Sequence, residues 1–195
     1  MLLLLCAPVG QLLIESRTRF TAPTEEVSHV ATAAFDATNA VVCFQDASNS
    51  NKGKCLHLGL SGTTITPGVE VEFEAGIVTK TSIAAFDSAN AVVCFEESTR
   101  GQCVHLGLLG TAITPKTAVE FEAGSIDFIS VTAFDPDNAV VCYEDAGDSK
   151  KGKCVHLNLS GTTITAAAPV EFETLETYDV SVAAFDATNA AVCYR

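Results

Sequence analysis

The chain has 195 residues, of which 48% are hydrophobic and 18% are charged. This composition is typical of a folded domain with a sizeable core and excludes a disordered tail. Against 24 acidic residues stand only 11 basic ones, and the net charge of −13 repels nucleic-acid backbones and anionic lipid surfaces. We therefore expect no nucleic-acid partner.

The N-terminal stretch MLLLLCAPVG contains four consecutive leucines. No basic residue precedes them, and the apolar run is shorter than a signal peptide normally needs. It is also far too short to span a bilayer. The sequence therefore predicts no membrane span and shows no convincing targeting signal.

One motif occurs four times along the chain. AAFDATNAVVCF at 33–44 returns as AAFDSANAVVCF at 84–95, TAFDPDNAVVCY at 132–143 and AAFDATNAAVCY at 183–194. The phenylalanines of these copies are 51, 48 and 51 residues apart, and the short spacing arises where FQDASNSNKGKC becomes FEESTRGQC. A length change confined to one segment marks a loop. A period of about 50 residues is typical of solenoid and propeller repeats.

Each repeat contains four runs of strand-forming residues and no helical periodicity. In the first copy these runs are HVATAAF, NAVVCFQ, GKCLHLGL and VEVEFE, and SGTTITPG is expected to be the loop between the last two. The fourth run alternates Val69, Val71 and Phe73 with glutamates, which predicts a strand with one solvated face. A small, alanine-rich inner strand and an acidic outer strand are typical of a β-propeller blade.

We therefore predict an all-β fold, a four-bladed β-propeller that forms a single domain over residues 1–195. Three blades are expected at about 27–76, 77–124 and 125–175, and the fourth at 176–195 completed by 1–26. Residues 6–20 align with residues 55–73 if a loop loses four residues, which places Cys6 on Cys55 and Phe20 on Phe73. The alternatives are a β-trefoil, which leaves the fourth motif without a place, and a fragment of a larger propeller.

The pattern AFDxxNAVVCF or AFDxxNAVVCY, followed by GxC and LSGTTIT, resembles tandem repeats of large uncharacterised proteins from marine microalgae and some bacteria. The resemblance covers residues 27–195. It implies a propeller-like fold and supplies no catalytic residues.

The eight cysteines fall on two repeated positions, one on the second strand of each unit and one on the third. Opposed positions on adjacent antiparallel strands lie within disulfide reach. The predicted disulfides are Cys43–Cys55, Cys94–Cys103, Cys142–Cys154 and Cys6–Cys193. Reduced, buried thiols are the alternative. Disulfides favour an extracellular or secretory-lumen location, although the missing signal peptide argues against it.

Histidine follows cysteine by two residues at His57, His105 and His156, a pattern that could suggest zinc. No fourth ligand recurs nearby, and Pro8 occupies the fourth histidine position. We therefore predict histidines packed between blades and no metal or other cofactor. The aspartates of the four FDxxN motifs are assigned to turns, because a catalytic constellation would not need to recur in every unit.

The connections between the second and third strands provide the candidate binding residues. These are Asp46, Asn49, Asn51, Glu97, Arg100, Asp145 and Asp148. The first loop has calcium-like oxygen spacing but lacks the glycine and the distal glutamate of an EF-hand, so solvated hairpin tips are the favoured interpretation.

The polar residues that break the repeat do not suggest a nucleophile–base pair or a carboxylate pair, so the sequence predicts no enzyme. They are His29, Arg100, Asp127 and Tyr178. Variation between copies concentrates in connections that a propeller brings to one end, which favours a non-catalytic interaction or structural module that binds a protein or a glycan. A lectin-like, carbohydrate-binding propeller is the alternative, weakened by the absence of Trp and the presence of only 3 Tyr. A glycan-processing hydrolase is less favoured, and the oligomeric state is left open.

Overall fold

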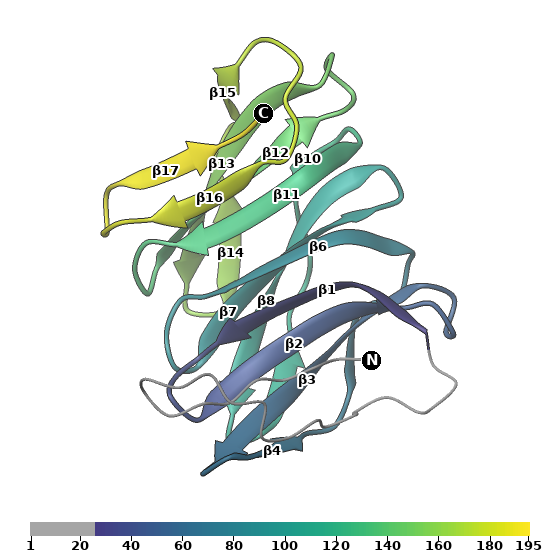
Figure 1. Cartoon of the computed structure of the whole chain (residues 1–195), viewed down its shortest axis with the longest axis vertical. Coiled ribbons are helices and arrows are strands. Elements are labelled where there is room, and N and C mark those ends of the chain that lie inside the picture. The colour runs from purple at the N-terminus through teal and green to yellow at the C-terminus, as the bar shows by residue number, and fades with distance from the viewer. Residues whose placement is uncertain (1–25) are drawn as a thin grey trace.

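The computed structural model describes residues 26–195 (Figure 1). This part of the chain forms 17 strands in four antiparallel sheets and contains no helix. The predicted all-β class is confirmed. Four separate sheets also replace the single barrel that the β-trefoil alternative requires.

The first sheet has five strands in the order β1-β2-β3-β4, with β5 also paired to β3. The strands are β1 (Val27–Ala34), β2 (Asn39–Asp46), β3 (Lys52–Ser61), β4 (Thr64–Pro67) and β5 (Val71–Glu74). Because β4 pairs with the end of β3 and β5 with its beginning, the two are halves of one interrupted outer strand.

This split corrects the sequence prediction in two places. The segment expected to be a loop contains β4, which begins directly after the tight turn at Gly62, where φ is +60°. Val69 lies in the interruption and is 82% exposed, although the alternation placed it on the apolar face with Val71 and Phe73. Pro67 ends β4, because proline lacks the N–H that would continue a strand ladder.

The second and third sheets repeat this arrangement. The second contains β6 (Val78–Ala85), β7 (Asn90–Glu97), β8 (Arg100–Leu109), β9 (Ala112–Pro115) and β10 (Val119–Glu122). The third contains β11 (Ile126–Ala133), β12 (Asn138–Asp145), β13 (Lys151–Ser160), β14 (Thr163–Ala166) and β15 (Val170–Glu173). The fourth has only β16 (Ser181–Ala184) and β17 (Ala190–Cys193).

The four sheets stack face to face along the longest axis of the molecule, from the first at the bottom of Figure 1 to the two-stranded sheet at the top. Their innermost strands pack in succession, β1 on β6, β6 on β11 and β11 on β16. No comparable packing joins β16 to β1, so residues 26–195 alone do not close a ring. The closure predicted through residues 1–26 falls almost entirely outside the described residues.

Aromatic pairs hold neighbouring sheets together. In each pair an outer-strand phenylalanine meets a ring that lies on the second strand of the next sheet or, for Tyr194, directly after it, with centroids about 5 Å apart. The pairs are Phe73–Phe95 at 5.1 Å, Phe121–Tyr143 at 5.1 Å and Phe172–Tyr194 at 5.2 Å.

Each outer-strand phenylalanine also lies across a glycine of its own sheet. A Cβ atom on Gly53 would stand 2.4 Å from the ring of Phe73, and one on Gly152 would stand 2.4 Å from that of Phe172. A side chain at these positions would therefore collide with the ring. This contact explains why glycine recurs two residues before cysteine in every complete unit.

Candidate functional site

The two ends of the strands differ in backbone conformation. One end, here called the hairpin face, carries the β2–β3, β7–β8 and β12–β13 hairpins and the segments that enter each innermost strand; it lies on the right in Figure 1. All ten non-glycine residues with positive φ in residues 26–195 lie on this face, whereas the three positive-φ glycines lie at the opposite end. The ten are His29, Ser50, Asn51, Lys80, Ser98, Thr99, Phe128, Ser149, Lys150 and Asp179.

Four of these residues occupy the same position in successive units, at the bulge of β1, β6 and β11 and just before β16. They are His29, Lys80, Phe128 and Asp179, with φ between 47° and 55°. A left-handed conformation costs a residue with a side chain roughly 1–2 kcal/mol, a cost that glycine would avoid. The fold therefore retains an imidazole, an ammonium, a phenyl ring and a carboxylate on one strained backbone position. Of these four residues, only His29 could be named from the sequence, as a residue that breaks the repeat. A positive φ at a non-glycine residue cannot be recognised from the sequence.

Two of the four residues that break the repeat, Asp127 and Tyr178, belong to a group of side chains on the hairpin face that extends from the second sheet to the segment before β16. We call this group the junction cluster; its members are Lys80, Asp127, Phe128, Lys150, Glu176 and Tyr178. Lys80 Nζ lies 3.0 Å from Asp127 Oδ1 and donates to the carbonyl oxygen of Ile126 at 2.6 Å. These contacts join the second sheet to the third.

Its aromatic half is an edge-on pair. The rings of Phe128 and Tyr178 have centroids 6.0 Å apart, and Phe128 remains 39% exposed. Lys150 Nζ lies 4.9 Å from the Tyr178 ring centroid and donates to its hydroxyl at 3.3 Å, and the hydroxyl donates to Glu176. Phe128, which follows Asp127 in the chain, is the residue that meets Tyr178 across the two units.

A buried carboxyl group lies beneath the cluster. Glu144 is 1% exposed, and its Oε2 has no hydrogen-bond partner in the described chain. Burial, and then the neighbouring Asp127, raises the pKa of Glu144 above the ordinary glutamate value. The group is therefore held towards its protonated form.

The equivalent carboxyl group one sheet earlier is fully bonded. Glu96 accepts hydrogen bonds from Thr79 Oγ1 at 2.9 Å, from Ser125 Oγ and from the backbone N–H of Ile126 at 3.2 Å, and pairs with Lys80 at 2.8 Å. Burial would raise its pKa, but the bonds to Lys80, Ser125 and Thr79 outweigh burial and lower the pKa. Equivalent positions thus carry one satisfied and one unsatisfied carboxyl group.

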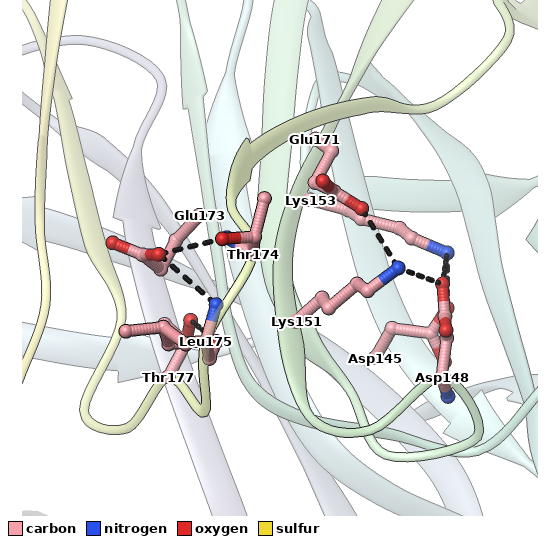
Figure 2. Close-up of polar contacts among 9 residues, drawn as sticks. All are labelled: Asp145, Asp148, Lys151, Lys153, Glu171, Glu173, Thr174, Leu175 and Thr177. Carbon is pink, nitrogen blue, oxygen red and sulfur yellow. Dashed lines mark hydrogen bonds and ion pairs between the residues drawn. The ribbon is translucent and has the colours of Figure 1, made fainter.

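Most of the predicted loop-binding residues are engaged in ion pairs. Asp46 pairs with Lys54 at 2.6 Å, and Asp145 pairs with Lys153 at 2.5 Å (Figure 2). Burial disfavours the charged form of Lys153, but its hydrogen bonds to Asp145 and Asp148 prevail and raise its pKa. These carboxylates anchor the hairpins.

Asp148 at the third hairpin tip lies 3.4 Å from Lys151 and 3.1 Å from Lys153, and Lys151 continues to Glu171 on the outer strand at 3.2 Å (Figure 2). This network ties the hairpin to the outer strand of its sheet. The carboxylates of Asp145 and Asp148 are therefore already paired with lysines and do not form an unpaired set of cation ligands at this hairpin.

The other predicted loop residues serve different hairpins. Glu97 accepts from Ser98 Oγ at 2.5 Å and from Gln102 Nε2 at 3.4 Å. Arg100 and Glu120 form an exposed pair at 3.3 Å, the kind worth about 0–1 kcal/mol. Asn49 and Asn51 act through the backbone, because the Asn49 N–H donates to the Asp46 carbonyl at 3.1 Å and the Asn51 carbonyl accepts from the Val78 N–H at 2.9 Å.

Three of the four predicted disulfides are present. They are Cys43–Cys55, Cys94–Cys103 and Cys142–Cys154, each joining the second and third strands of a sheet with Cα atoms 4.1 Å apart. Cys193 is free and exposed. Its predicted partner, Cys6, lies outside the described residues.

The repeated aspartates and histidines belong to one hydrogen-bonded network at the end opposite the hairpin face. Asp36 Oδ1 accepts from the Thr38 N–H at 2.7 Å and from the Asn39 N–H at 2.8 Å. Asn39 directs its amide group to Asp36, which leaves its Oδ1 to contact His57 Nε2 at 2.8 Å. Burial lowers the pKa of His57, so the neutral ring donates from Nε2. The network ties a turn to the third strand of its sheet.

Residues 26–195 lack two kinds of feature. No group of three or more His, Cys, Asp and Glu side chains there is placed to hold a metal ion. No helix in this range is long and apolar enough to cross a membrane.

Comparison with known proteins adds fold information only. No protein-family model and no curated protein matches the chain. AofleA from Arthrobotrys oligospora superposes with a TM-score of 0.52 at 14% identity over 86% of this chain and 52% of that one, and so does its mutant with three arginines replaced by alanine. A hypothetical selenium-binding protein from Sulfolobus tokodaii gives 0.49 at 10% identity over 70% of this chain and 39% of that one. The chain spans about half the length of AofleA.

Proposed function

We propose that the protein is a non-catalytic binding module that presents its hairpin face to a partner, with the junction cluster at the centre of contact. In this proposal the sheets are propeller blades at about 27–76, 77–124 and 125–175, and a fourth at 176–195 is completed by residues 1–26. The stacked sheets act as a rigid scaffold, and the side chains on one end supply recognition.

The observation that carries the proposal is the distribution of left-handed residues. Ten side chains are kept at positions where glycine would relieve strain, and all of them lie on one face. At the opposite end the equivalent demand is met by Gly62, Gly110 and Gly161. Backbone strain is retained on the hairpin face and avoided by glycine at the opposite end. This difference supports a role in binding for the side chains of the hairpin face.

The junction cluster supports a polar ligand with an apolar side. Phe128 is partly exposed beside Tyr178, and Lys150 and Asp127 offer charges of both signs within the same group. Such a surface suits a peptide segment with mixed charge, and a glycan is the second candidate because aromatic rings also stack on sugars. The three disulfides favour an extracellular or secretory-lumen setting.

The test compares two single variants against the wild-type protein. Phe128→Ala removes the exposed ring of the hairpin face, and Leu109→Ala removes an 84% exposed apolar side chain at the opposite end. Binding is screened on a glycan array and on a panel of secreted proteins, and each hit is measured by interferometry. We expect Phe128→Ala to weaken binding by about tenfold or more, equivalent to about 1.4 kcal/mol, and Leu109→Ala to leave it unchanged.

Three results would contradict the proposal. Equal binding by both variants would remove the hairpin face as the site. Turnover of a bound glycan would make the protein an enzyme. Failure to retain any member of the two panels would argue against a binding module.

A further inference from the structure

The fourth sheet has an open edge. β17 pairs with β16 on one side, and no strand in residues 26–195 pairs with its other side. In the complete sheets the equivalent second strand pairs with the third strand, as β2 does with β3 from Asn39 to Asp46. An unpaired strand edge is a template for another strand.

Two side chains on this edge lack the partners that their equivalents have. In the first sheet Cys43 is bonded to Cys55, and Asn39 Oδ1 contacts His57. At the fourth sheet Cys193 is a free, exposed thiol.

The second of these side chains is already oriented for a partner. Asn189 Nδ2 donates to both oxygens of Asp186 at 2.9 Å, as Asn39 does to Asp36. Its Oδ1 therefore points to a site that no described residue fills. The unpaired edge of β17, the free thiol of Cys193 and the orientation of Asn189 together match a third strand that carries a cysteine opposite Cys193.

The other end of the stack presents a complementary face. Val42, Phe44, Leu56 and Leu58 form a cluster whose described members all belong to the first sheet. In the second sheet the equivalent ring, Phe95, receives the outer-strand phenylalanine of the preceding sheet. The face around Phe44 is therefore built to receive an outer-strand phenylalanine from a sheet that precedes the first.

Residues 6–20 carry both missing groups. Cys6 aligns with the third-strand cysteines and Phe20 with the outer-strand phenylalanines. Pro8 aligns with His57. In the first sheet the pair Val41–His57 is two residues along from the disulfide-bonded pair Cys43–Cys55, and the N–H of His57 points away from β2. A proline at this position would therefore not remove a hydrogen bond to the second strand. The alignment departs from the complete units at Pro8 and also at Leu4, which stands two residues before Cys6 where those units have the glycine that lies under the outer-strand phenylalanine.

The spacing to β1 decides where this segment lies. Phe73 precedes the start of β6 by five residues and Phe121 precedes the start of β11 by five, whereas Phe20 precedes Val27 by seven. Seven extended residues span at most about 25 Å, and packed sheets lie about 10 Å apart. This length is enough to reach a sheet stacked directly before the first, whereas β17 of the same chain lies at the far end of the stack (Figure 1).

We propose that residues 6–20 of one copy complete the fourth sheet of a second copy, pairing with its β17 and forming a Cys6–Cys193 disulfide between the two chains. The contact is heterologous, so it generates either a closed ring of copies or a filament. In forming the bond, one thiolate attacks an external disulfide such as oxidised glutathione, and the second thiolate then displaces the mixed-disulfide partner. The external disulfide takes up two electrons and leaves as two thiols.

The first test mixes two isotopic forms of the full 195-residue chain. Unlabelled and ¹⁵N-labelled protein are unfolded under reducing conditions, mixed in equal amounts and refolded with a glutathione redox buffer. Non-reducing peptide mapping then follows the peptide that links Cys6 to Cys193. We expect about half of the linked pairs to be hybrids of light and heavy chains, as random exchange between copies requires. Linked pairs without hybrids would place the bond inside one chain, and the absence of linked pairs would remove the contact.

The second test uses complementary variants. Cys6→Ser and Cys193→Ser are each expected to lose all disulfide-linked oligomers on non-reducing gels. An equal mixture of the two should regain a covalent dimer, because each variant keeps the cysteine that the other lacks. A mixture that stays unlinked, or wild-type protein that sediments as a monomer before and after reduction, would overturn the proposal.

Discussion

Replacing Glu144 with glutamine should stabilise the protein at neutral pH. In the first sheet the same position is Gln45, whose Nε2 donates to the carbonyl oxygen of Val78 in the next sheet at 2.5 Å. Glu144 is 1% exposed and leaves Oε2 without a partner, and it can donate only when protonated. The amide keeps the shape of the side chain and supplies the donor at any pH.

The size of the effect follows from the cost of a buried group without a partner, about 1–3 kcal/mol. For a domain of this length, each kcal/mol of added stability raises Tm by about 2–4 °C. The charged groups that act on Glu144 are Asp127 and Glu176, which raise its pKa together with burial, and Lys80 and Lys150, which lower it. Burial and Asp127 prevail.

The sign of the pH dependence follows from that raised pKa. The folded state holds the Glu144 proton more tightly than the unfolded state, so the contribution of Glu144 to stability is fully present below the ordinary glutamate pKa and is lost as pH rises through the raised value. The glutamine variant lacks this loss. Its advantage should be small at acidic pH and reach its full size above the raised pKa.

Thermal unfolding followed by circular dichroism between acidic and neutral pH measures both effects. Glu96→Gln is the matched control at the equivalent position, and it should lower stability at neutral pH by about 1–3 kcal/mol because that carboxylate accepts bonds from Thr79, Ser125 and Lys80. Its lowered pKa means that the loss should shrink as pH falls. A destabilising Glu144→Gln, or the same sign for both variants at neutral pH, would refute the reasoning.

Further changes have expected outcomes that the same unfolding assay checks. Gly152→Ala should destabilise by about 1–3 kcal/mol, because the new Cβ would lie 2.4 Å from the ring of Phe172; an unchanged Tm would show that the ring can move aside. Tyr143→Phe should cost about 1–2 kcal/mol at neutral pH, because the hydroxyl donates to Glu122 at 3.0 Å, and a neutral outcome would mean that water replaces this bond. Reduction of the disulfides should cost about 3 kcal/mol per bridge from loop entropy, and unfolding that is insensitive to reductant would contradict these pairings.

Much of the fold could be predicted because its signals are local and repeated. The spacing of cysteines such as Cys43 and Cys55 gave the disulfide pairing, and strand-like runs located the first three strands of each unit. The interrupted outer strand was missed because Thr64–Pro67 reads as turn-rich and is held by pairing with β3. Its register depends on the partner strand, which single-sequence patterns do not reveal.

The candidate site was harder to predict than the fold. The junction cluster depends on which sheets are neighbours, because Phe128 and Tyr178 belong to different units and their rings meet only through stacking. The bulge at Phe128 was invisible because its φ of 47° has no residue signature. The hairpin aspartates were visible, but their lysine partners could be assigned only once the strand register was known.

The contact of each outer-strand phenylalanine with the next sheet has a consequence for how the protein unfolds. Within residues 26–195 each sheet packs mainly against its immediate neighbours, so stability approximates a sum over units and nearest-neighbour interfaces, as in a one-dimensional chain of coupled elements. A terminal unit has one such interface where an internal unit has two. In a chain that is not joined to a second copy, amide hydrogen exchange should therefore form a gradient, fastest in β16 and β17 and slowest in the second sheet, with opening that spreads inward from the end.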